Sequence, residues 1–219
     1  MDSIKAMIFD ADGVLLDSME LWDQLSLDYL TSQGISGPEN LNDIMFSMSY
    51  REGCQYLKDH FLPSKTVEEI DEDLKNRMED FYFKIVNAKE GVADFLAFLQ
   101  EKNYPMVIVT STEERLVRGA LKRLQLEEYF LNILSAPDLQ TSKREAPIFL
   151  QALEILGTKG KNTFLVEDAL YSIETGKSIG LKIIGVYDRF NEEEQEEIRK
   201  QSHFYIKTAR DWEKIKEEL

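Results

Sequence analysis

Five short apolar runs constrain the fold of this 219-residue chain more than any other feature of its sequence. They lie at Ile4–Phe9, Met106–Val109, Ile133–Leu134, Thr163–Val166 and Lys182–Val186. Each run is typical of a buried strand, and segments with helical periodicity separate them. Strands that alternate with helices form a parallel sheet with helices on its faces. We therefore predict an α/β fold with a Rossmann-like parallel sheet.

The segment 15–88 interrupts this alternation. It contains no convincing buried strand, and its apolar residues recur at three- and four-residue intervals, as in an amphipathic helix. Two such faces are Leu21, Leu25 and Tyr29, and Leu74, Met78, Phe81 and Ile85. Gly34, Gly37-Pro38 and Leu62-Pro63 divide the segment into about four helices. We predict a catalytic core of residues 1–14 and 89–219, with residues 15–88 inserted as an all-helical cap.

Composition excludes several kinds of partner and site. The 26 basic and 41 acidic residues give a net charge of -15, which argues against nonspecific binding of nucleic acid or of an anionic membrane. Cys54 is the only cysteine, so the chain has no internal disulfide and no thiol cluster for a metal. His60 and His203 lie far apart in the sequence and suggest no metal pair. No apolar stretch is long enough for a membrane span and no secretion signal is visible, so we expect a cytoplasmic protein.

Polar residues with useful chemistry follow three of the predicted strands. Ligands of open parallel sheets bind beyond the carboxyl ends of the strands, so these positions are the first candidates for a site. They are Asp10 and Asp12 after the first strand, Thr110 and Ser111 after the second, and Glu167 and Asp168 after the fourth. Lys143 precedes a helix predicted from about Pro147 to Leu156, in the third connection.

Asp10 and Asp12 are two residues apart, which directs both side chains to the same side of an extended segment. Glu167 and Asp168 would join them to make a cluster of four carboxylates. Such a cluster needs a cation, and its oxygens suit Mg²⁺.

The remaining candidates would bind an anion beside this cluster. Lys143 adds a positive charge, Thr110 and Ser111 can donate hydrogen bonds to phosphoryl oxygens, and Gly13 permits close backbone approach. The set matches the needs of phosphoryl transfer: a nucleophile, an acid or base, a metal and donors.

Each element has an ordinary structural explanation when it is considered alone. Asp-x-Asp-Gly is a common turn, Thr110-Ser111 could cap a helix, Lys143 could be a surface lysine, and Glu167-Asp168 could begin a helix. A calcium loop does not fit, because Gly13 directly follows the second acid and a strand precedes the motif. The order and spacing of the four elements together favour a site.

Together, these motifs resemble the haloacid dehalogenase superfamily, in its phosphatase and beta-phosphoglucomutase-like branch with a helical cap. The stretches that carry the resemblance are Phe9-Asp10-Ala11-Asp12-Gly13-Val14-Leu15-Leu16-Asp17-Ser18 and Val166-Glu167-Asp168, with Ser172-Ile173-Glu174 and Gly180-Leu181. The resemblance implies that Asp10 attacks phosphorus and forms an aspartyl phosphate. Asp12 would protonate the leaving oxygen and then activate water.

The same resemblance implies the groups that bind phosphate and metal. Thr110 and Lys143 would hold the phosphoryl group. The side chains of Asp10 and Asp168 and the main-chain carbonyl of Asp12 would bind Mg²⁺, with Glu167 as a direct ligand or one step removed.

The chain departs from the family pattern at several positions. Arg144 and Ala146 replace prolines that usually follow the lysine, which leaves the placement of Lys143 open, and Ser172 stands where glycine is common. Trp22 occupies the position of a histidine that assists transfer in the mutase, so it could line a cap pocket or simply pack in a helix. Arg51 falls near an arginine that binds the distal phosphate in the mutase, and it could equally be an exposed residue at a helix start.

The sequence therefore favours a phosphoric monoester hydrolase acting on a small phosphorylated metabolite. A carboxylate at Asp12 suits an alkoxide leaving group better than a halide, which needs no proton. The near alternative is a beta-phosphoglucomutase-like sugar phosphomutase, which Trp22 disfavours. Alternatives of a different class are a phospho-acceptor signalling protein and a catalytically silent binding protein. The sequence names no physiological substrate and leaves the oligomeric state open, with a monomer as the default expectation.

Overall fold

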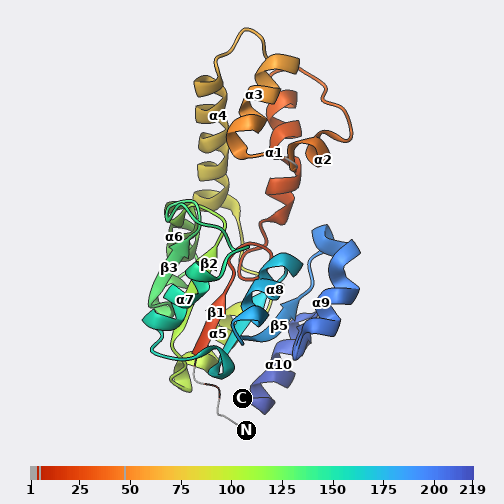
Figure 1. The fold of residues 1–219 in the computed structure, drawn as a ribbon. Coiled ribbons are helices and arrows are strands. Elements are labelled where there is room, and N and C mark those ends of the chain that lie inside the picture. The colour runs from red at the N-terminus through yellow and green to blue at the C-terminus, as the bar shows by residue number, and fades with distance from the viewer. Residues whose placement is uncertain (1–3, 5, 47) are drawn as a thin grey trace. The chain divides into compact units, whose positions relative to one another are not determined.

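The computed structural model describes residue 4 and residues 6–46 and 48–219 (Figure 1). The chain divides into two compact units. One consists of Met1–Ser18 together with Val86–Leu219, and the other of Met19–Ile85. The first is built around a sheet and the second is helical, as the interrupted pattern of apolar runs predicts.

The larger unit contains a six-stranded sheet in the order β3-β2-β1-β4-β5-β6, in which all neighbouring strands are parallel. Its strands are β1 (Ala6–Phe9), β2 (Met106–Thr110), β3 (Asn132–Ser135), β4 (Thr163–Glu167), β5 (Lys182–Val186) and β6 (Phe204–Ile206). The predicted α/β fold with a Rossmann-like sheet is confirmed. The sequence analysis missed β6, because this edge strand has only three residues and two of them are partly exposed.

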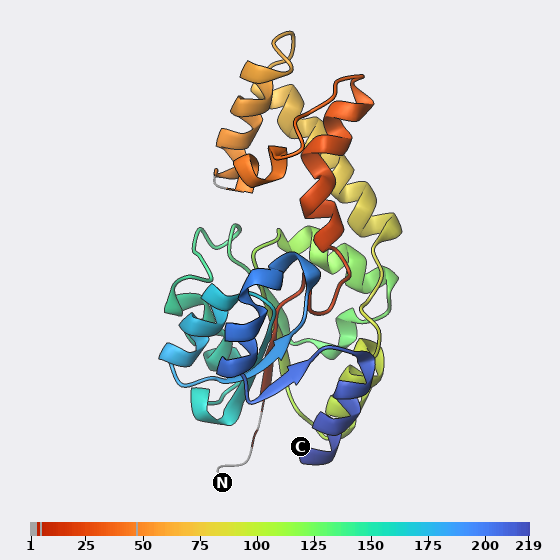
Figure 2. The same cartoon turned by 90° about the vertical axis from the view of Figure 1, so that its right-hand side faces the viewer.

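Helices cover both faces of this sheet, as Figure 2 shows. They are α5 (Val92–Glu101), α6 (Glu114–Arg123), α7 (Ala146–Ile155), α8 (Leu170–Ser178), α9 (Gln195–Gln201) and α10 (Ala209–Glu218). Short helical turns η2 (Glu127–Tyr129), η3 (Gly160–Asn162) and η4 (Arg189–Glu194) connect them to the strands. Successive residues of β1 serve opposite faces. Ile8 belongs to a core cluster with residues of α7, α8 and α9, whereas the ring of Phe9 meets Phe95 of α5.

The smaller unit consists of α1 (Met19–Ser32), α2 (Leu41–Phe46), α3 (Tyr50–His60), α4 (Val67–Asp80) and the π-helical turn η1 (Phe81–Ile85). Ser49 and Thr66 begin α3 and α4 with capping boxes that satisfy otherwise unpaired N–H groups at the helix starts. Tyr29 of α1 donates a hydrogen bond to Asp73 of α4 at 2.8 Å, and this bond joins the two longest helices.

The division between the units falls inside the predicted bounds of 15 and 88, at Ser18 and Val86. The two connecting segments pair with each other before the helical unit begins. The amide of Lys89 donates to the carbonyl of Leu15 at 2.9 Å, and the amide of Asp17 donates to the carbonyl of Asn87, also at 2.9 Å. Residues 15–18 and 86–88 therefore belong to the larger unit. None of the helices in the described ranges is long and apolar enough to cross a membrane.

The core on the α5 and α10 side of the sheet depends on Phe95, which is 1% exposed and stacks on Trp212 with ring centroids 4.5 Å apart. We expect Phe95→Ala to lower the free energy of unfolding by about 3–5 kcal/mol, because it leaves a cavity between two helices and β1. Chemical denaturation measures this change. Leu131→Ala is the matched control, since Leu131 is 62% exposed and its loss should cost less than about 0.5 kcal/mol. Equal losses in the two variants would contradict this role of Phe95.

Candidate active site

The sheet reverses its direction of strand addition between β1 and β4. The chain adds β2 and β3 on one side of β1, and β4, β5 and β6 on the other. Such a switch point opens a crevice beyond the carboxyl ends of the two strands, where ligands of parallel sheets bind. Asp10 directly follows β1, and its amide donates to the carbonyl of Val166 in β4 at 2.9 Å. Asp168 directly follows β4, so two of the predicted acids lie at this point.

Asp10, Glu167 and Asp168 form a buried acidic cluster in which one carboxylate oxygen of each residue lies within 4.8 Å of the others. Burial and the Glu167 carboxylate raise the pKa of Asp10 well above its usual value. Burial, Glu167 and Asp10 likewise raise the pKa of Asp168. A divalent cation would relieve this repulsion, and a set of oxygen donors suits Mg²⁺. The residues present therefore fit a magnesium ion.

Gly13 allows this cluster to lie close to the loop after β1. Its φ of 76° is in the left-handed region that favours glycine. A Cβ atom at this position would lie 2.4 Å from Oδ2 of Asp168, a distance that forbids any side chain unless Asp168 moves. The glycine of the Asp-x-Asp-Gly motif is therefore required by the packing of Asp168 against the loop.

Lys143 lies inside the cluster and is 2% exposed. Its Nζ atom is 2.9 Å from Oδ2 of Asp10 and 2.7 Å from Oε2 of Glu167. Burial is the largest influence on its pKa and opposes the charge, but Asp10 and Glu167 together hold the pKa well above its usual value. Lys143 is thus a buried cation beside the proposed nucleophile.

The unusual lysine motif does not displace Lys143. The amide of Arg144 donates to the Ser142 hydroxyl at 3.1 Å, which fixes the turn before α7. The Arg144 guanidinium lies 4.2 Å from the ring centroid of Tyr171 in α8, a cation–π contact between α8 and the lysine loop. Contacts of the loop therefore replace the rigidity that prolines would give it.

Glu167 is surrounded by donors from the protein. Its Oε1 atom accepts from the amides of Asp168 and Ala169, both at 3.1 Å. Its Oε2 atom accepts from the Ser172 hydroxyl at 2.6 Å as well as from Lys143. Ser172 is helical and fully buried, and its hydroxyl has a use that the common glycine could not supply.

Asp12 has hydroxyl partners that the sequence analysis did not identify. Thr112 donates to its Oδ2 atom at 2.7 Å, and Ser18 donates to its Oδ1 atom. The amide of Thr112 also donates to Oγ1 of Thr110 at 3.0 Å, so the loop after β2 lies against the loop after β1. Thr110 is fully buried, whereas Ser111 is exposed. Thr112 could have been suspected, since it follows the same strand as Thr110.

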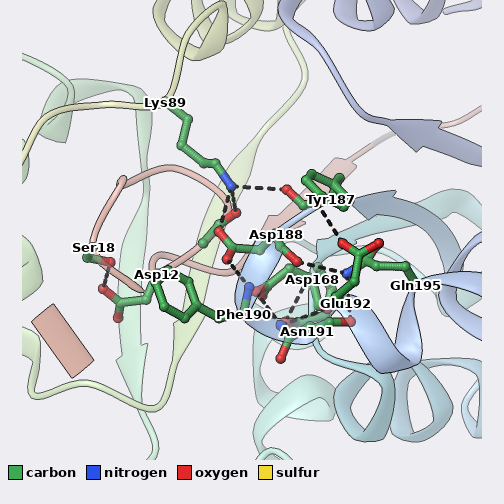
Figure 3. Close-up of polar contacts among 12 residues, drawn as sticks. Asp12, Ser18, Lys89, Asp168, Tyr187, Asp188, Phe190, Asn191, Glu192 and Gln195 are labelled. Carbon is green, nitrogen blue, oxygen red and sulfur yellow. Dashed lines mark hydrogen bonds and ion pairs between the residues drawn. The ribbon is translucent and has the colours of Figure 1, made fainter. Parts of the chain in front are cut away.

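Asn191 and Asp188 are further residues near the site that the sequence analysis missed (Figure 3). The side-chain amide of Asn191 donates to Oδ2 of Asp168 at 2.8 Å. Asp188 accepts from Lys89 at 2.9 Å. Asp188 lies two residues beyond β5, so the rule that polar residues after strands mark a site would have pointed to it. Asn191 lies in η4 and carries no comparable signal.

Trp22 and Arg51 belong to the helical unit. The indole of Trp22 donates to the Tyr82 hydroxyl at 3.1 Å, and the two rings are 6.5 Å apart between centroids. The Arg51 side chain is 85% exposed and lies 3.8 Å from Glu68, a weak surface ion pair. Within its unit, Trp22 thus contributes to packing and Arg51 is a solvated side chain at the start of α3.

A family model described as haloacid dehalogenase-like hydrolase matches residues 7–186. A phosphorylated carbohydrates phosphatase of Thermotoga maritima is 27% identical over 190 residues, which cover 86% of this chain and 88% of the relative. A pyrophosphatase, PpaX, of Halalkalibacterium halodurans is 26% identical and covers 82% of this chain and 81% of its own.

Solved structures show the same fold. The structure of a candidate beta-phosphoglucomutase of Thermotoga maritima matches 99% of this chain and 100% of its own, with a TM-score of 0.85 and 26% identity. The structure of Rhodobacter sphaeroides CbbY in complex with phosphate matches 85% of this chain and 88% of its own, with a TM-score of 0.70. Its 18% identity makes it evidence for the fold alone.

The raised pKa values of Asp10 and Asp168 give the cluster a pH-dependent stability. A folded-state carboxyl pKa above the unfolded value means that the folded chain binds more protons between the two values, so stability without a cation should fall as pH rises through that window. Mg²⁺ competes with those protons. We therefore expect saturating Mg²⁺ to raise the Tm more at about pH 8 than at about pH 5.

Thermal melts with and without Mg²⁺ at the two pH values measure this difference. Asp168→Asn is the control, because it removes one of the titrating carboxylates and should abolish most of the Mg²⁺-induced shift. A shift of the same size at both pH values would contradict the prediction.

Proposed function

The chain belongs to the haloacid dehalogenase-like hydrolase family, and from this premise we propose that it is a Mg²⁺-dependent phosphatase of a small phosphorylated metabolite, acting through an aspartyl phosphate on Asp10. The observation that carries the proposal is the buried Lys143, which contacts Asp10 and Glu167 at the switch point of the sheet. The phosphatase and pyrophosphatase activities in the names of the curated relatives support it.

Asp10 would act as the nucleophile. One oxygen of its carboxylate attacks phosphorus, the bond from phosphorus to the ester oxygen breaks, and an aspartyl phosphate forms. The amide of Ala11, which donates to Oδ1 of Asp10 at 2.7 Å, and Lys143 at Oδ2 fix the orientation of this carboxylate. Lys143 would also attract the anionic substrate into the cluster.

Asp12 would donate a proton to the leaving alkoxide and would then take a proton from the water that attacks the aspartyl phosphate. That second attack releases inorganic phosphate and restores the Asp10 carboxylate. Both oxygens of Asp12 accept from hydroxyls, those of Ser18 and Thr112. Asp12 must therefore exchange at least one of these partners for a substrate oxygen during the reaction.

The carboxylates of Asp10 and Asp168 and the main-chain carbonyl of Asp12 would hold Mg²⁺. Four groups donate to the Glu167 carboxylate, which favours a role for Glu167 in fixing Lys143. A contact of Glu167 with the cation would be a second role. The metal, when bound, neutralises charge on the phosphoryl oxygens. Thr110 and Ser111 would donate to those oxygens from the loop after β2.

A sugar phosphomutase is the second candidate, since one structural relative is described as a candidate beta-phosphoglucomutase. Trp22 disfavours it, because an indole whose N–H donates to Tyr82 has no base to offer to a sugar phosphate. Incubation with a bisphosphorylated hexose separates the two activities. A phosphatase releases inorganic phosphate, whereas a mutase exchanges isomers without net release.

We propose a monomeric cytoplasmic protein without nucleic-acid or membrane partners, in keeping with its net charge of -15. A phospho-acceptor signalling protein and a catalytically silent binding protein are less well supported, because the buried cluster of Asp10, Glu167 and Asp168 with Lys143 suits hydrolysis of a phosphate ester. Trp22 and Arg51 remain proposed determinants of substrate selectivity.

The nucleophile assignment predicts that Asp10→Asn abolishes turnover. With Mg²⁺ present, the wild-type protein should hydrolyse a generic aryl phosphate, and the variant should fall to the background rate, because a neutral amide cannot form the aspartyl phosphate. Colorimetric phosphate release measures the rates, and circular dichroism checks that the variant is folded. Wild-type turnover in a folded Asp10→Asn variant would overturn the assignment.

The acid role of Asp12 predicts a loss that depends on the leaving group. Asp12→Ala should reduce kcat for an alkyl phosphate by about 10²–10⁴-fold, the usual contribution of a general acid or base. For the formation of the aspartyl phosphate from nitrophenyl phosphate the loss should be much smaller, because nitrophenolate leaves without a proton. Single-turnover kinetics with both substrates isolate this step. Equal losses would argue against proton donation by Asp12.

A further inference from the structure

We propose that Asn191 is a positioning residue that orients the carboxylate of Asp168 for a divalent cation. The inference rests on the proposed magnesium site and adds a residue that lies outside all the motifs of the sequence. Asn191 comes from η4, a turn that follows β5, whereas Asp168 follows β4. Figure 3 shows the two side chains together with the residues that hold them.

Within the part of the chain that the structure describes, the side-chain amide of Asn191 donates two hydrogen bonds, both to Asp168. Its nitrogen donates to Oδ2 at 2.8 Å and to the main-chain carbonyl at 3.2 Å. The loop of Gly13 approaches the same oxygen. Rotation of the Asp168 carboxylate is therefore restricted on two sides.

A neutral donor is the appropriate group at this place. A lysine or arginine would fix Asp168 equally well but would cancel the charge that a cation requires. An amide holds the oxygen by a hydrogen bond and leaves the carboxylate its full charge. Such outer partners of metal-binding carboxylates commonly determine the affinity of the site for its metal.

Asn191 is itself held firmly by the main chain around it. Its backbone departs from helical geometry, with φ -111° and ψ 27°, so that η4 is kinked at this residue. The backbone N–H of Asn191 donates to the carbonyl of Asp188 at 3.1 Å. The backbone carbonyl of Asn191 accepts from the Gln195 side chain at 3.1 Å. Gln195 is 7% exposed and accepts in turn from the Tyr205 hydroxyl at 2.6 Å. The turn therefore has support that does not involve the Asn191 side chain.

Lys89 connects this turn to the loop that carries Asp12. Its Nζ atom lies 2.9 Å from Oδ2 of Asp188 and donates to the carbonyls of Gly13 at 2.7 Å and Tyr187 at 3.2 Å. The positive charge of Lys89 also offsets Asp188, whose carboxylate would otherwise repel that of Asp168. The turn with Asn191 and the loop with Gly13 are thus fixed relative to each other on either side of Asp168.

Calorimetric titration of the intact protein with MgCl₂, without any substrate, tests the inference. Asn191→Leu keeps much of the side-chain volume and removes the donor, and it should weaken Mg²⁺ binding about 10–100-fold, as the loss of comparable outer partners does. Gln201→Leu is the matched control, because Gln201 carries the same side-chain amide in α9 and donates to Glu197 at 2.9 Å, outside the Asn191 turn. It should leave the dissociation constant for Mg²⁺ near that of the wild type.

The outcomes separate this inference from the proposed function. A wild-type protein that binds no Mg²⁺ would overturn the cation site and the role of Asn191 with it. Tight wild-type binding that Asn191→Leu leaves unchanged would overturn only the inference, as would equal weakening by Gln201→Leu. Should circular dichroism show that Asn191→Leu is unfolded, Asn191→Ser takes its place with the same expectation, because the serine hydroxyl is too short to reach Asp168.

Discussion

The structure depends on placing three buried carboxylates and one buried lysine at the switch point of a parallel sheet. Asp10, Glu167 and Asp168 would repel one another if they were all ionised in an apolar surrounding, and Lys143 offsets only part of their charge. Without a cation, the cluster carries raised carboxyl pKa values at Asp10 and Asp168. The fold therefore accepts an electrostatic cost at the place where an anionic substrate and a cation would remove it.

Hydrogen-bond donors of the surrounding chain reduce this electrostatic cost. Glu167 accepts from two amides, a hydroxyl and Lys143, so its charge is well compensated. Hydrogen bonds of this kind favour the ionised form, and the pKa of Glu167 is lowered despite its burial and through Lys143 above all. Among the three acids, Glu167 is therefore the one whose charge the protein itself compensates, and Asp10 and Asp168, whose pKa values are raised, have most to gain from a metal.

The sequence predicted the sheet and the gathering of Asp10, Glu167 and Asp168 beside it, because both follow from short, local patterns. A buried strand is recognisable as a run of apolar residues. The end of that run marks the carboxyl end of the strand, and the acids lie directly after it. β6 escaped notice because an edge strand needs no continuous apolar run. The contacts of Ser18, Thr112 and Asn191 with the acids were not predicted, because they join residues of separate loops. Asn191 lies 23 residues beyond Asp168, and no pattern of spacing records a hydrogen bond between two separate turns.

The altered lysine motif shows how the same geometry can arise from different residues. Prolines after a lysine restrict its loop before folding, whereas Arg144 and Ala146 leave the loop free in the unfolded chain. In the folded chain, two carboxylates attract the Lys143 ammonium, and the contact of Arg144 with Tyr171 joins the loop to α8. Placement of the lysine thus depends on attraction by the acids that it serves. A loss of charge at Asp10 or Glu167 would therefore affect the position of Lys143 as well as its pKa, and the acids and the lysine act as one unit.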